Sequence, residues 1–80
     1  MRIRLREEER IFQGTAAQVV AQMQGTAIFA AHLSLDAYID WCVANGKRGG
    51  VEVNVSGTTL DERCGSLVAE LVRTGFAEKL

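Results

Sequence analysis

Proline is absent from this chain of 80 residues, and cysteine and histidine are scarce. Without proline, no rigid linker marks a boundary, and the length suffices for one domain, so we expect a single domain over residues 1–80. The single histidine, His32, and the two cysteines, Cys42 and Cys64, form no C-x-x-C or H-x-x-x-H spacing. The sequence therefore predicts neither a metal site nor a cofactor.

Net charge is also small, because nine Lys and Arg residues oppose ten Asp and Glu residues. A net charge of -1 excludes a strongly basic nucleic-acid binder and an acidic tail protein. Intrinsic disorder is excluded as well, because 48% of the residues are hydrophobic. These limits leave a small folded protein with a thin core, for which self-association is the remaining source of extra stability.

Long apolar runs are missing too. No stretch reaches the ~18 uncharged apolar residues that a membrane span requires. The segment from Met1 to Arg6 lacks the apolar run of a secretory signal peptide. We therefore expect a cytoplasmic protein with no membrane partner, in which both cysteines are free thiols.

The first pattern that is present is an alternation over residues 2–6, which places Ile3 and Leu5 on one face and three arginines on the other. Residues 10–13 resemble a second strand, so we predict a hairpin with residues 7–9 as its connection. Phe12 then shares the face of Ile3 and Leu5. A helix over residues 4–12 is the alternative, because Glu and Arg favour helices.

Capping patterns predict the helices. Thr15 and Gln18 form a capping box before a helix that weakens at Gly25, and Ser34 caps a helix over residues 35–44. Residues 26–33 between them are ambiguous. We expect the apolar residues of this stretch to lie in the core: Ile28, Phe29 and Leu33.

The second half begins with a predicted loop over residues 45–50 and a predicted strand over residues 51–55, where three valines share one face. Thr59 and Glu62 form a second capping box, followed by a helix with an apolar stripe that ends near Gly75. Residues 76–80 are a candidate edge strand. The sequence thus predicts a two-layer α+β domain of order β-β-α-α-β-α(-β), with helices on one face of a three- or four-stranded sheet.

The helix over residues 35–44 is apolar around most of its circumference, since only Asp36 and Asp40 interrupt it. Such a helix is either central or faces a partner, and a small domain has little room for a central helix. We therefore expect a non-enzymatic interaction module, most simply a homodimer, although another protein partner is possible. The expected interface residues are Leu35, Tyr38, Ile39, Trp41 and Cys42.

Two alternative sites are compatible with the sequence. Nucleic-acid phosphates could contact a basic set made of Arg2, Arg4, Arg6, Arg10, Lys47 and Arg48. No aromatic residue is interleaved among the arginines to stack on bases, and the Glu7–Glu9 run is close in sequence. A solvated charged surface is therefore favoured over a nucleic-acid site.

The other alternative is a small anion-binding protein or enzyme that uses His32 and a strand-to-helix junction made of Ser56, Gly57, Thr58 and Thr59. This segment lacks a phosphate-binding glycine motif, so turn formation and helix capping are favoured. Catalysis by His32 with Cys42 or Cys64 is disfavoured, because both cysteines lie on apolar helix stripes.

Overall fold

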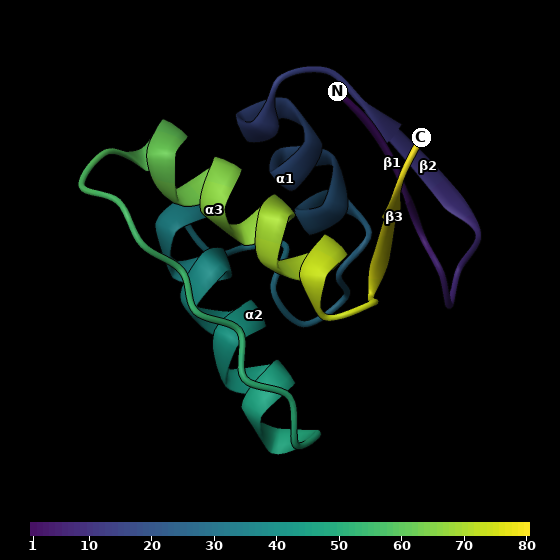
Figure 1. The fold of residues 1–80 in the computed structure, drawn as a ribbon. Coiled ribbons are helices and arrows are strands. Elements are labelled where there is room, and N and C mark those ends of the chain that lie inside the picture. The colour runs from purple at the N-terminus through teal and green to yellow at the C-terminus, as the bar shows by residue number, and fades with distance from the viewer.

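Three strands and three helices make up the structure, a computed structural model that describes residues 1–80 (Figure 1). The order is β1 (Arg2–Leu5), β2 (Arg10–Gln13), α1 (Ala16–Gly25), α2 (Leu35–Arg48), α3 (Leu60–Arg73) and β3 (Ala77–Lys79). The strands form one open antiparallel sheet in the order β2-β1-β3, and the helices lie to one side of it. The predicted α+β class is therefore confirmed.

The N-terminal hairpin is present, and the helical alternative for residues 4–12 is wrong. Ile3 pairs with Phe12, and both side chains are buried beneath the helices. The connection is a turn in which Glu9 adopts a φ of 53°, in the left-handed region. Apolar alternation outweighed helix propensity because Ile3 and Phe12 then share the face that the helices cover.

The last strand, β3, pairs with β1 along the edge opposite β2, as the candidate edge strand predicts. Leu5 lies opposite Ala77, and Arg4 lies opposite Glu78, where the two side chains form an ion pair at 2.7 Å. The chain enters β3 through Gly75, whose φ of +86° matches the predicted left-handed helix end.

Helix starts follow their predicted caps. Thr15 accepts from the backbone N–H of Gln18 and Thr59 from that of Glu62, and in both cases the partner side chain accepts the cap's own N–H. Ser34 accepts from the N–H of Ala37. These local hydrogen bonds satisfy donors that the first helical turn leaves free, so the starts are set by adjacent residues.

The predicted strand over residues 51–55 is wrong, because this segment joins no sheet. It runs beside α2 and α3 instead (Figure 1), with Val53 buried and Val51 and Val55 partly buried. Side chains of α3 take the place of a neighbouring strand: the N–H of Asn54 donates to Glu70, and that of Ser56 donates to the hydroxyl of Ser66. The alternating valines mark one buried face, which helices cover as well as strands do.

Residues 45–48 were predicted as loop and are the last turn of α2 instead. Gly46 lies where the valine segment crosses the helix. A Cβ on Gly46 would stand 3.1 Å from Val53 Cγ2 and 3.2 Å from the Val51 carbonyl oxygen. The Val51 N–H also donates to the Gly46 carbonyl at 2.8 Å. The glycine that suggested a loop is therefore a point of close packing inside a helix.

One hydrophobic core joins the inner sheet face to the three helices, and no polar side chain is buried in it. Each helix contributes fully buried residues, among them Val19 of α1, Ile39 of α2 and Leu67 of α3. None of the three helices combines the length with the hydropathy that a membrane-spanning helix requires.

Candidate functional site

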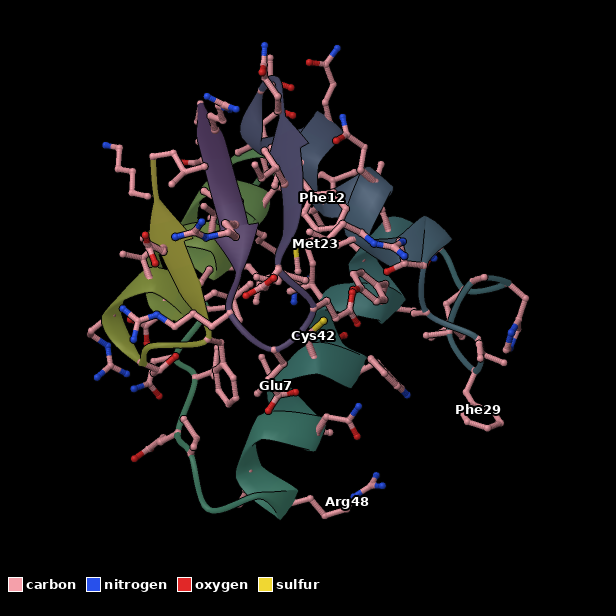
Figure 2. All side chains as sticks on the ribbon, turned by 90° about the vertical axis from the view of Figure 1, so that its right-hand side faces the viewer. Glu7, Phe12, Met23, Phe29, Cys42 and Arg48 are labelled. Carbon is pink, nitrogen blue, oxygen red and sulfur yellow. The ribbon has the colours of Figure 1, made fainter.

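The α1–α2 loop, residues 26–34, carries the two most exposed large apolar side chains of the protein. Ile28 is 87% exposed and Phe29 is 81% exposed. Figure 2 shows Phe29 projecting away from the body of the molecule. The expectation that both residues lie in the core is therefore wrong, and only Leu33 of that group is partly buried.

The exposure of these two residues follows from how the loop is anchored. Ala30 is fully buried, so it holds the loop against the core. The Gln24 amide donates to the carbonyls of Ala30, at 3.1 Å, and of Leu33, at 2.6 Å. With Ala30 facing inward and these carbonyls held to α1, the preceding residues, Ile28 and Phe29, face solvent.

The surroundings of these residues in the sequence are free of charge. Residues 11–35 contain no Asp, Glu, Lys or Arg, and the exposed residues of α1 are Gln18, Ala21, Gln22 and Gly25. Protein interfaces are depleted of charge at their centres and enriched in aromatic residues. The α1–α2 loop therefore has the composition of a contact surface. The sequence signal was present in the uncharged run, but it did not indicate which of its apolar residues face outward.

The predicted interface on α2 is divided by the fold. Tyr38 and Ile39 are buried inside the chain, whereas Leu35, Trp41 and Cys42 are partly exposed. Tyr38 stacks on Trp41 with ring centroids 5.8 Å apart. Burial raises the pKa of the Tyr38 phenol and the pKa of the Cys42 thiol, so both stay neutral at physiological pH.

The polar stripe of α2 is used within the chain. Asp36 and Asp40 both accept from the guanidinium of Arg63 on α3, the second at 2.6 Å. Hydrogen bonding to Asp40 and Asp36 raises the pKa of Arg63. This pairing joins α2 to α3, and the guanidinium offsets one of the two carboxylate charges.

The basic residues considered for nucleic-acid binding are not gathered on one surface. Arg4 is paired with Glu78 on the outer sheet face, and Arg10 lies 3.9 Å from Glu8. Arg48 lies at the far end of α2 from the sheet (Figure 2). Lys47 precedes it there, while Arg2 begins β1 and Arg6 lies in the hairpin turn. The outer sheet face therefore offers an interrupted row rather than a continuous basic surface.

Donors within the predicted anion site, residues 56–59, already bind the carboxylate of Glu62. Its Oε1 accepts from the N–H of Thr59 at 3.0 Å and from the N–H and hydroxyl of Thr58. The hydrogen bond from the Thr59 backbone, followed by the bonds with the Thr59 and Thr58 side chains, lowers the pKa of Glu62. Gly57 packs tightly on Glu62, and the N–H of Ser56 donates to Ser66. The donors of Thr58 and Thr59 are therefore engaged at the start of α3, and that of Ser56 is engaged with the middle of the helix.

The residues weighed for catalysis are dispersed. His32 is exposed in the α1–α2 loop, Cys64 is fully buried in α3, and Cys42 lies on α2. Burial raises the pKa of the Cys64 thiol, which disfavours the nucleophilic thiolate. No group of three His, Cys, Asp or Glu side chains is placed to hold a metal ion.

Comparisons of the chain with protein-family models, with curated proteins and with solved structures found no match.

Proposed function

We propose that the protein is a non-enzymatic interaction module that self-associates through the α1–α2 loop, with the exposed parts of Leu35 and Trp41 on α2 contributing. The observation that carries this proposal is the exposure of Ile28 and Phe29, 87% and 81%, on a loop that hydrogen bonds hold in place. An anchored loop presents these side chains in a defined position, so binding a partner costs little conformational entropy of the loop.

A second copy of the chain is the favoured partner. A two-fold interface brings the same patch of each copy together, so a charged residue on it would lie near a residue of the same charge on the other copy. The run over residues 11–35 avoids that repulsion because it has no charged residue, and the net charge of -1 opposes association little.

The free energy available from burying Ile28 and Phe29 is comparable to the cost of association. Burying Ile28 and Phe29 from both copies contributes roughly 6–12 kcal/mol, at 1.5–3 kcal/mol for each side chain. Association itself costs roughly 4–15 kcal/mol. The two side chains alone therefore do not guarantee a dimer, and neighbouring surface on α1 and α2 must also be covered.

The proposal includes a cytoplasmic location. Its support is that Cys42 and Cys64 are both free thiols, as is usual in reducing compartments.

Light scattering coupled to size exclusion tests the proposal. We expect the wild type to dimerise at high micromolar concentration and Phe29→Ser and Ile28→Ser to be monomeric. At concentrations too low for dimerisation, these variants should unfold at the same temperature as the wild type. Ile11→Ser is the matched control, because Ile11 is exposed on the outer sheet face, away from the loop. Trp41→Ala is expected to weaken association as well, but it also removes the stack on Tyr38.

A monomeric wild type at high micromolar concentration contradicts self-association. Dimerisation that survives Phe29→Ser and Ile28→Ser but is lost in Ile11→Ser contradicts the choice of surface.

A further inference from the structure

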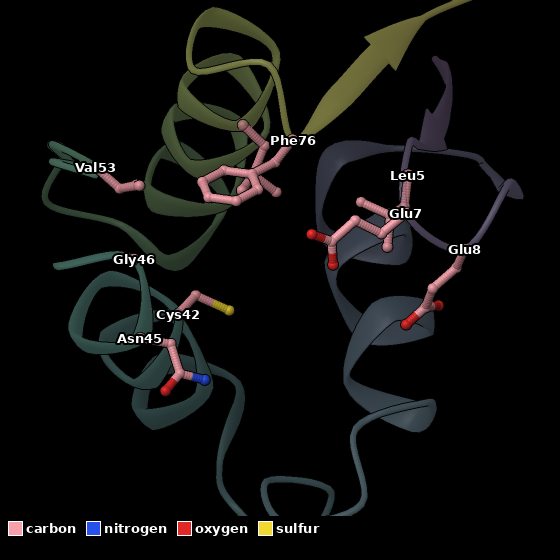
Figure 3. Close-up of a pocket in the computed structure, with 9 residues that line it drawn as sticks. Leu5, Glu7, Glu8, Cys42, Asn45, Gly46, Val53 and Phe76 are labelled. Atoms are coloured by element: carbon pink, nitrogen blue, oxygen red, sulfur yellow. The ribbon is translucent and has the colours of Figure 1, made fainter. Parts of the chain in front are cut away.

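A hollow of about 230 Å³ opens where the hairpin turn meets α2 and the junction of α3 with β3 (Figure 3). It is separate from the α1–α2 loop, none of whose residues lines it. Its walls come from four parts of the chain that lie far apart in sequence. The lining residues are Leu5, Glu7, Glu8, Cys42, Asn45, Gly46, Val53, Leu71 and Phe76.

Most of the wall is apolar. Two of the lining residues, Leu71 and Val53, belong to the buried core. Phe76 places its ring at the edge of the hollow (Figure 3). The Cys42 side chain also points inward. Because burial raises the pKa of this thiol, it is a neutral part of the wall at physiological pH. These surfaces suit the hydrocarbon portion of a ligand.

The polar part of the hollow is dominated by Glu7. Its carboxylate points toward the space between Phe76 and Cys42 (Figure 3), and it forms no ion pair or hydrogen bond within the chain. Glu8 stands farther out on the same rim and lies 3.9 Å from Arg10. No Lys or Arg lines the hollow, so the carboxylate of Glu7 is not neutralised there.

We infer that this hollow binds a small organic ammonium ion with an apolar body. The ammonium group pairs with Glu7, and the ring of Phe76 adds a cation–π contact. The hydrocarbon part covers Val53 and Leu71. At roughly 30 Å³ for each water-sized group, the volume accommodates roughly seven or eight non-hydrogen atoms. A divalent metal ion fits the site poorly, because hard cations require about six oxygen ligands.

Titration with n-hexylammonium, followed by amide NMR, tests this inference. We expect saturable shifts at Leu5, Cys42 and Phe76, with a Kd on the order of 1 mM, as suits a ligand of this size. Added salt should weaken binding, because the ion pair is partly exposed. Hexan-1-ol has the same number of non-hydrogen atoms without the charge, and it should bind up to roughly fivefold more weakly.

Glu7→Gln should weaken n-hexylammonium binding roughly fivefold, the scale of a partly exposed ion pair. Glu9→Gln is the matched control: it removes the same charge from the same turn but lies outside the hollow. It should bind like the wild type.

Equal binding of hexan-1-ol and n-hexylammonium overturns the inference, as does unchanged affinity in Glu7→Gln. Shifts centred on residues 26–34 instead of the hollow also overturn it. If Glu7→Gln fails to fold, the comparison of the two ligands with the wild type decides the question. Oligomeric state does not enter this test, so it can fail or succeed independently of the proposed self-association.

Discussion

Glu70 of α3 accepts the backbone N–H of Asn54 through its Oε1 atom at 2.7 Å. Arg73 orients the same carboxylate, with its Nε 2.6 Å from Glu70 Oε2, and donates to the carbonyl oxygen of Glu52 at 2.9 Å. Two helix side chains thus bond to the backbone on both sides of Val53. They hold the valine segment against the helices where a sheet would have used a neighbouring strand.

This arrangement predicts a pH dependence. The hydrogen bonds from Arg73, followed by that from Asn54, lower the pKa of Glu70 below its ordinary value. A carboxyl group with a lowered folded-state pKa contributes stability above its unfolded pKa, about 4.3, and loses it as pH falls through the folded pKa. In urea unfolding, Glu70→Gln should therefore show a shallower decline of the free energy of unfolding below that pH than the wild type. Glu9→Gln should follow the wild type. Equal slopes in wild type and Glu70→Gln would rule out this role.

Two helical glycines should respond to alanine in opposite directions. Gly65→Ala should stabilise the protein by about 0.5–1 kcal/mol, because a Cβ there meets no atom within 4 Å and alanine favours the helix. Gly46→Ala should destabilise it by about 1 kcal/mol, because its Cβ would press on Val53 and on the Val51 backbone. Thermal and urea unfolding compare the two variants. A stabilised Gly46→Ala would contradict this prediction and would show that Val51 and Val53 move aside at little energetic cost.

The core position of Ile39 predicts a large loss on truncation. Ile39 is fully buried in the first half of α2, so Ile39→Ala should cost about 2–5 kcal/mol. Ile11→Ala, on the outer sheet face, should change stability by less than about 1 kcal/mol. Denaturant unfolding provides both values. A small loss in Ile39→Ala would mean that α2 is not anchored in this core.

The basic residues should not create a nucleic-acid site. Arg4 is paired with Glu78, and Arg48 lies at the other end of the molecule, so few phosphates can be contacted at once. A fluorescence-anisotropy titration of a single-stranded oligonucleotide at low salt should remain flat. Saturable binding that weakens steeply with salt would restore the nucleic-acid hypothesis.

Predictions made from the sequence succeeded where neighbouring residues decide the outcome. The capping boxes at Thr15 and Thr59 formed as expected, because each is closed by a residue three positions away. The pairing of Ile3 with Phe12 also followed from local alternation. The interface prediction on α2 was less specific: apolar character identified Tyr38 and Ile39, which the chain covers itself.

By itself, the sequence determined the α+β class, the hairpin, the helix starts and the thin core, because these depend on periodicity and on short-range hydrogen bonds. Only the tertiary structure decided which partner each apolar face meets. Val53 packs against helices because Glu70 and Arg73 form hydrogen bonds with the backbone groups on either side of it. Phe29 is exposed to solvent because Ala30 is the residue of this loop that is buried in the core. Both outcomes depend on elements brought together from distant parts of the chain, and no local pattern encodes that choice.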